Sequence, residues 1–162
     1  MYNDLIVMTF TREQDALIAM FSLDMMRDRN LLGLGTATIL AVDKSGRFII
    51  NQAWELEDYP HSQEGRVPGG LARMLFGDKT GKGKQQLIKV GLDDIFLQNL
   101  LDAAIPDSSV LFFYIPRESL VDTERLRKTL SRLRGTLYHT TFPNTAEETI
   151  LQGLEYNAGA SM

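Results

Sequence analysis

The sequence predicts a single α+β domain, and three observations support this prediction. Two apolar runs, Leu5–Phe10 and Ser109–Ile115, have the length and the β-branched and aromatic composition of buried strands. Apolar residues recur at helical spacing after each run. The turn sequence Asp43–Gly46 separates two further strand-like segments and predicts a β-hairpin. With 162 residues, 44% of them hydrophobic, the chain is long enough to bury one core.

The first half of the chain divides into a strand, a helix and the hairpin. Thr11 follows the first strand as a possible N-cap, and a helix is expected from about Arg12 to Arg29. Its apolar residues at helical spacing are Ala16, Met20, Leu23 and Met26. The strands of the hairpin are expected over Thr36–Val42 and Phe48–Leu56.

The second half alternates between helices and strands. A helix capped by Asp93 or Asp94 is expected to end before Pro106, and the run 109–115 follows as a central strand. Leucines at helical spacing then mark a third helix, which precedes a fifth strand over 136–142. A final helix completes the chain; its apolar positions are Ala146, Ile150, Leu151 and Leu154.

The order of the first six elements is the split βαβ, or ferredoxin-like, pattern βαββαβ. In that pattern a four-stranded antiparallel sheet carries its helices on one face. The extra αβα at the C-terminus is expected to extend the sheet and cover more of it. We therefore expect one domain over residues 1–157, interrupted after the third strand by an insertion at 57–92, with a flexible tail at 158–162.

A glycine-rich stretch inside the insertion has a charge opposite to that of the rest of the chain. Residues 65–90 hold six basic side chains and one acid, a net of +5, whereas the whole chain is −4. Such an asymmetry is typical of a surface that binds an anion or meets a partner. With the basic stripe of the third helix included, the candidate residues for this surface are Arg66, Arg73, Lys79, Lys82, Lys84, Arg125, Lys128 and Arg132. The stripe can equally be the solvated face of that helix.

The lysine-rich part of the insertion, Lys79–Lys84, does not complete a phosphate-binding motif. A P-loop requires G-x-x-x-x-G-K-[ST], and here Phe76 stands at the first glycine and Gly83 at the Ser or Thr position. Short charge runs of this kind are usually solvated. A flexible loop is therefore the expected structure.

Composition excludes several classes of function. The absence of cysteine excludes disulfides, thiolate catalysis and thiolate-bound metals. The longest stretch without a charged residue, 30–42, is shorter than the roughly 20 apolar residues that a spanning helix needs. Because a strand is expected to begin at Asp4, we expect no signal peptide. The pI of about 5.2 argues mildly against nucleic acid as a partner.

The two histidines do not form a recognisable catalytic set. His61 lies among acids in an expected loop, where it is more often solvated than metal-bound, and His139 fits a partly buried strand residue. No Ser-His-Asp, H-E-x-x-H or G-x-S-x-G arrangement is present. We expect no cofactor, no metal and no catalytic residue, and the question of an enzyme stays open.

Several short motifs, in their order and spacing, resemble a bacterial family of domains of unknown function that are described as uncharacterised or predicted membrane proteins. These motifs are Asp4–Val7 with Phe10, Asn51–Leu56, Gly69–Gly77, Gly91–Asp94, Ser108–Phe112 and Gly135–Leu137. The resemblance implies a ferredoxin-like domain interrupted by a Gly/Ala-rich apolar hairpin. This chain departs from the family there, because a polar stretch, 78–84, replaces the apolar part. The resemblance brings no catalytic residues.

Three functions are compatible with these features. The preferred one is a non-enzymatic, homo-oligomeric binding or assembly module, because sheet edges can pair between subunits and the insertion can exchange between them. The second is peripheral attachment to anionic lipid through an amphipathic basic segment whose apolar residues are Leu71, Met74, Leu75 and Phe76. The third is a small-ligand sensor or an enzyme that uses a histidine or the arginine stripe. The expected location is the cytoplasm or the membrane periphery.

Overall fold

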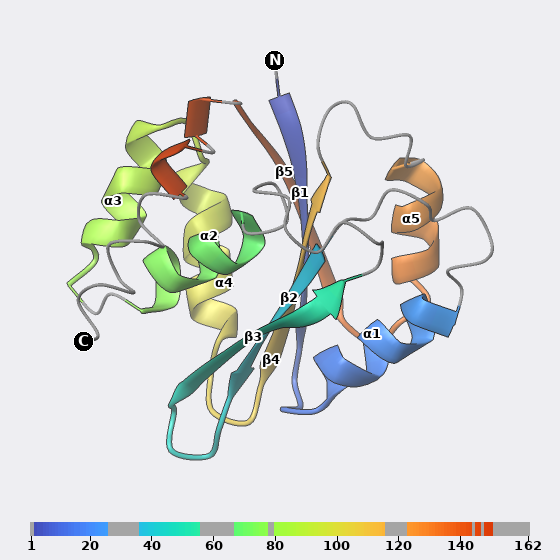
Figure 1. The fold of residues 1–162 in the computed structure, drawn as a ribbon. Coiled ribbons are helices and arrows are strands. Elements are labelled where there is room, and N and C mark those ends of the chain that lie inside the picture. The colour runs from blue at the N-terminus through green and yellow to red at the C-terminus, as the bar shows by residue number, and fades with distance from the viewer. Residues whose placement is uncertain are drawn as a thin grey trace.

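The described residues form a five-stranded sheet with helices on both faces (Figure 1). The computed structural model describes residues 2–25, 36–55, 67–77, 80–115, 123–143, 145–146 and 148–150. Its elements in chain order are β1 (Tyr2–Phe10), α1 (Asp15–Met25), β2 (Thr36–Val42), β3 (Phe48–Glu55), α2 (Val67–Phe76), α3 (Lys82–Lys89), α4 (Asp94–Ala103), β4 (Ser109–Ile115), α5 (Thr123–Leu130) and β5 (Thr136–Pro143). The predicted tail at 158–162 lies outside the described residues.

The strand order is β3-β2-β4-β1-β5, and all neighbouring strands are antiparallel. The α+β class and the central position of β4 are confirmed. The ferredoxin-like arrangement of the first four strands is not, because that pattern would place β1 beside β3. The hairpin instead keeps β3 next to β2, and β4 takes the place between β2 and β1. β3 is therefore left at one edge of the sheet, and β5 forms the other.

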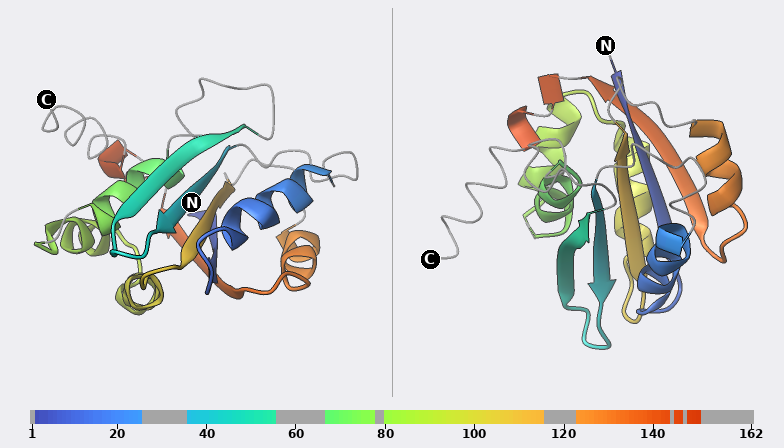
Figure 2. Two further views of the ribbon diagram at one scale, coloured as in Figure 1. Left: turned by 90° about the horizontal axis from the view of Figure 1, so that it is seen from below. Right: turned by 45° about the vertical axis from the view of Figure 1, so that its right-hand side comes forward.

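Helices cover both faces of the sheet, which corrects the prediction that they pack on one (Figure 2). On one face, α2, α3 and α4 cover a core cluster that contains Leu5, Val7 and Phe112. On the other, α1 and the end of α5 contribute to a second cluster that contains Ile6 and Phe113. The cause is in the sequence of the inner strands. Successive side chains of a strand point to opposite faces, so an unbroken apolar run needs cover on both.

The described part of the basic insertion is folded, not an exposed loop. Residues 67–76 form α2 and residues 82–89 form α3, whereas 57–66 and 78–79 lie outside the described residues. The four apolar side chains predicted to contact lipid are buried in the core: Leu71, Met74, Leu75 and Phe76. The glycines serve close packing here. A Cβ added at Gly83 would lie 1.8 Å from the carbonyl oxygen of Met74, so only glycine lets α3 approach α2 this closely.

The third helix of this layer, α4, begins where the sequence predicts. The Asp93 carboxylate accepts a hydrogen bond from the backbone N–H of Phe96 at 3.1 Å and caps the helix. Phe96, Leu97 and Leu100 are buried on its inner face. Of the described helices, none combines the length and apolarity required to cross a bilayer.

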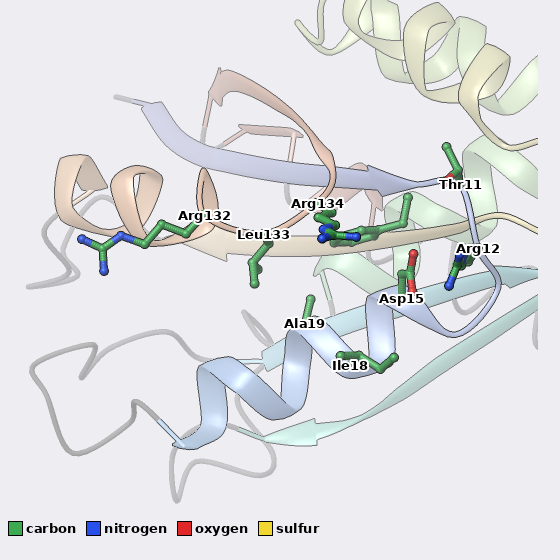
Figure 3. A pocket seen from close by; sticks show the side chains of 9 residues that line it. Thr11, Arg12, Asp15, Ile18, Ala19, Arg132, Leu133 and Arg134 are labelled. Carbon is green, nitrogen blue, oxygen red and sulfur yellow. The ribbon is translucent and has the colours of Figure 1, made fainter.

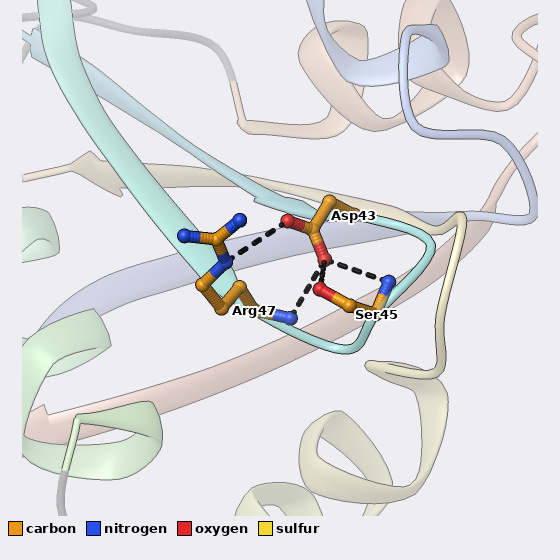
Figure 4. Close-up of polar contacts among 3 residues, drawn as sticks. All are labelled: Asp43, Ser45 and Arg47. Carbon is orange, nitrogen blue, oxygen red and sulfur yellow. Dashed lines mark hydrogen bonds and ion pairs between the residues drawn. The ribbon is translucent and has the colours of Figure 1, made fainter.

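The hairpin between β2 and β3 is closed by one carboxylate (Figure 4). Asp43 Oδ1 accepts hydrogen bonds from the backbone N–H groups of Ser45 and Arg47, both at 2.9 Å, and from the Ser45 hydroxyl at 2.7 Å. Asp43 Oδ2 lies 3.4 Å from Arg47 Nε. Hydrogen bonds to the carboxylate favour its charged form and therefore lower the pKa of Asp43. The bond from the Ser45 hydroxyl makes the largest contribution.

We expect the Asp43 carboxyl to titrate below its ordinary pKa of 3.8. Because the folded pKa is lower than the unfolded one, the ionised group stabilises the protein above the unfolded pKa, and this contribution is lost as the pH falls through the folded pKa. Carboxyl-carbon NMR measures the titration directly. Ser45→Ala should raise the pKa towards 3.8, and a wild-type midpoint at or above 3.8 would contradict the hydrogen-bond network.

Candidate functional site

The predicted basic residues do not form one surface. Arg73, Lys82 and Lys84 belong to α2 and α3, on one side of the sheet, whereas Lys128 and Arg132 lie in or just after α5 on the other side. Arg66 and Lys79 fall outside the described residues, as does the side chain of Arg125 within α5. Within the described ranges, the sheet separates the two groups of cations, so they cannot bind one ligand together.

Lys84 has a structural role between two helices. Its Nζ lies 2.9 Å from Asp94 Oδ1 and donates a hydrogen bond to Gln98 Oε1 at 2.7 Å. The side chain is only 19% exposed, so its charge is directed into the contact between α3 and α4. Lys82, by contrast, is exposed at the start of α3. Of the predicted insertion cations, Lys84 is therefore already paired.

A groove of about 410 Å³ lies on the α1 and α5 side of the sheet, between α1 and the chain that leads from α5 into β5 (Figure 3). Its apolar lining consists of Phe10, Ile18, Ala19 and Leu133. Its polar lining consists of Thr11, Arg12, Asp15, Arg132 and Arg134. Arg12, Asp15 and Arg134 gather around the start of α1, whereas Arg132 extends away from them. A groove of this size is within the range of small-molecule sites.

Long-range contacts hold both walls of the groove. The buried Ser109 hydroxyl donates to the carbonyl oxygen of Arg12 at 2.7 Å and accepts from the N–H of Ala16 at 3.0 Å, which fixes the turn before α1 to β4. On the other wall, a Cβ at Gly135 would lie 2.7 Å from the Phe10 ring and 2.9 Å from the carbonyl oxygen of Thr9. Glycine at this position therefore lets the chain that carries Arg134 lie directly against the end of β1.

The groove is cationic in an acidic protein. It contains three guanidinium groups and one carboxylate, and within the described part of the chain no guanidinium group of the groove lies within 4 Å of a carboxylate oxygen. Arg132 is the one groove residue that the sequence predicts. Arg12 is missed because it comes near Arg134 only when β5 pairs with β1. In the sequence, the side of the groove that follows α5 is marked by two nearby arginines, Arg132 and Arg134.

The outer edge of β3 is a second candidate surface. Among the described strands β3 pairs with β2 alone. Phe48 and Ile49 at its start are 39% and 53% exposed. Phe48 leans on Phe76 of α2, with ring centroids 5.5 Å apart, whereas Ile49 belongs to the opposite face of the sheet. Large apolar side chains on an unpaired edge are typical of a strand that pairs with another chain.

The histidines contribute no described catalytic arrangement. His139 Nε2 lies 2.8 Å from Asp4 Oδ1 across the β1–β5 pair, so this strand histidine has a polar partner. His61 lies outside the described residues. In the ranges that the structure describes, no three His, Asp or Glu residues gather in a way that could hold a metal ion.

Comparison with models of known families, with curated proteins and with solved structures finds no match. The function is therefore inferred from the groove and the β3 edge themselves.

Proposed function

We propose that this protein is a non-enzymatic assembly module whose copies pair through the outer edge of β3. The observation that carries the proposal is the exposed Ile49 on a strand with one partner among the described strands. Between Phe48 and Trp54 the strand contains neither proline nor a charged residue, the devices by which edges usually avoid pairing. The other edge strand, β5, is richer in polar residues and ends at Pro143.

The hairpin geometry specifies how two copies would pair. The N–H of Asp43 donates to the carbonyl oxygen of Arg47, so the backbone groups of these two residues face each other across the hairpin. Along an antiparallel strand, the backbone N–H and C=O groups of successive residues point alternately to one neighbour and to the other. The backbone groups of Ile49 therefore point towards β2, and those of Phe48 and Ile50 point outward. An antiparallel pair centred on Ile49 would join Phe48 of one copy to Ile50 of the other. The two Ile49 side chains would then meet on the symmetry axis.

An extra β3 residue opposite β2 limits the regular part of this edge. The register shifts between Ala37 and Ile39, where two steps along β2 correspond to three along β3. Such a bulge twists an edge and ends regular pairing. The available segment is therefore Phe48–Asn51, which is why we place the symmetry axis at Ile49.

Ile49→Lys is expected to abolish the dimer, because it would place two ammonium groups opposite each other on the axis. Sedimentation velocity should show wild type associating at micromolar concentration and the variant as a monomer. Ile95→Lys is the matched control: it makes the same change at a 71% exposed isoleucine of α4, and it should leave the dimer intact. A monomeric wild type, or equal effects of the two variants, would refute the proposal.

A cross-link tests the register. The chain has no cysteine, so Ile49→Cys introduces a single thiol per copy. Directly opposed residues that do not exchange hydrogen bonds across the new pair have their side chains close together, within reach of a disulfide. Mild oxidation should convert Ile49→Cys to a covalent dimer and leave Ile95→Cys largely monomeric.

Attachment to lipid is less well supported than assembly. The apolar half of the predicted amphipathic segment is buried against the sheet, which leaves exposed charges such as Lys82 without apolar partners from α2. Charge alone gives weak and salt-sensitive membrane binding.

We also propose a finer assignment of the fold. The elements β1, α1, β2, β4, α5 and β5 would form a split βαβ core, with β3 and α2–α4 as an elaboration inside it. Three facts support this assignment: β4 lies between β1 and β2, β1 lies between β4 and β5, and α1 and α5 share one face. The elaboration then includes the point at which the bacterial family that the sequence resembles is interrupted. In this chain, the elaboration consists of β3 and of helices whose exposed residues are mostly polar.

A further inference from the structure

We infer that the groove beside α1 binds a small organic anion that carries a carboxylate or phosphate head on an apolar body. The inference rests on the groove alone and is independent of the pairing of β3. Three features carry it: the charge of the walls, the apolar floor, and the contacts that hold the walls in place.

The charge comes mainly from two arginines that line the same groove. Arg12 and Arg134 lie on opposite walls near the start of α1, and neither has a carboxylate within 4 Å in the described part of the chain. A guanidinium group presents paired N–H donors that match the two oxygens of a carboxylate or phosphate. Arg132 extends away and would act mainly through its field. The helix start itself adds little, because Ser109 already satisfies the Ala16 N–H.

The floor of the groove is apolar, which distinguishes it from a simple phosphate site. Phe10 and Ala19 are buried beneath it, and Leu133 and the exposed Ile18 form its sides. Burial of a ligand's alkyl carbons against such a surface is favourable by the hydrophobic effect. An inorganic ion would leave this surface wet and gain only the contacts to the arginines.

The walls are fixed before a ligand arrives. Ser109 ties the Arg12 turn to β4, and the Gly135 contact places the chain after α5 against β1. That chain is further held by backbone hydrogen bonds from Leu133 to Leu130 and from Gly135 to Leu133, both 3.0 Å. Backbone segments that are already held in place do not have to be ordered when a ligand binds. Asp15 is the exception to the charge pattern, and it would weaken the binding of any anion.

Calorimetric titration with octyl phosphate and octanoate, each below its micelle concentration, tests the inference. We expect at least one of them to bind, the tighter one identifying the head group. Inorganic phosphate should bind at least tenfold more weakly, and octyltrimethylammonium should not bind. If neither amphiphile binds, the inference is wrong. If inorganic phosphate binds as tightly as the amphiphiles, the groove does not recognise an apolar body. If octyltrimethylammonium binds as tightly, the groove does not recognise an anionic head. Either result overturns the inference.

Substitutions locate the binding in the groove. Arg12→Gln and Arg134→Gln should each weaken binding about tenfold or more, as expected for the loss of a charge-assisted hydrogen bond. Asp15→Asn should strengthen binding. Lys128→Gln removes an exposed charge of α5 outside the groove lining and should have little effect. Circular dichroism checks that each variant is folded. Equal affinities for wild type and both arginine variants would place the binding elsewhere and overturn the inference.

Discussion

Replacing either Phe112 or Phe113 with alanine is expected to lower the free energy of unfolding by about 3–5 kcal/mol. These neighbours on β4 are almost fully buried but point to opposite faces of the sheet. Phe112 belongs to the core cluster covered by α2, α3 and α4, with its ring 6.2 Å from that of Phe76. Phe113 belongs to the cluster on the other face, to which α1 and the end of α5 contribute. Each truncation therefore removes apolar contacts and leaves a cavity in a different layer. Urea unfolding followed by circular dichroism measures both effects.

The comparison of the two variants is a test of the three-layer architecture. With helices on one face only, one phenylalanine would face solvent and its loss would cost little. Ile95→Ala provides the reference for an exposed apolar residue, and we expect it to change stability by about 0.5 kcal/mol or less. A cost below about 1 kcal/mol for either phenylalanine would show that its face of the sheet is open.

Gly83→Ala is expected to destabilise the protein by about 3 kcal/mol, although it adds one methyl group. The new Cβ would lie 1.8 Å from the carbonyl oxygen of Met74 and 2.7 Å from its carbonyl carbon. These are backbone atoms of α2, so the clash cannot be relieved by a side-chain rotation. α3 would have to move away from α2, which would loosen the packing of Leu87 in the core. Thermal and urea unfolding report the loss.

Gly81 is the matched control two residues earlier. It has φ of 81° and no atom within 4 Å of an added Cβ, so its requirement is conformational and not steric. Asparagine tolerates this backbone region, and Gly81→Asn should cost about 1 kcal/mol or less. If Gly83→Ala were as mild as Gly81→Asn, the close contact between α2 and α3 would not exist as described.

The local features of the fold follow from short sequence signals. The Asp43–Gly46 turn predicts the hairpin because its hydrogen bonds lie within five residues. Asp93 predicts the start of α4 for the same reason. The unbroken apolar run of β4 also predicts a central strand. The order of the strands is less accessible, because the β1–β4 and β1–β5 pairs join segments that are about 100 to 140 residues apart in the chain.

Composition misled the prediction for the basic insertion. Its lysines and glycines are typical of a solvated loop, but charge counts do not report which face of a helix each residue occupies. Leu71, Leu75 and Leu87 lie on the inner faces of α2 and α3, whereas Lys82 faces outward. Gly83 has the opposite role to the one its type suggests, since it enables tight packing.

The candidate site was predictable only in part. The stripe on the third helix points to Arg132, yet the residues that define the groove depend on the pairing of β5 with β1. Arg12 has no basic neighbour in sequence that would mark it as part of a cluster. The β3 edge depends in the same way on where β4 enters the sheet. The groove and the β3 edge both form only when the strands take this order in the sheet.

Amide hydrogen exchange across α2 and α3 tests the central claim, that the basic segment forms part of the folded core. The N–H groups of Leu75, Phe76 and Leu87 lie in helices whose side chains fill the core, so we expect them to exchange about as slowly as the amides of β4. Exchange of these amides at the rate of an unstructured peptide, while β4 stays protected, would contradict the account.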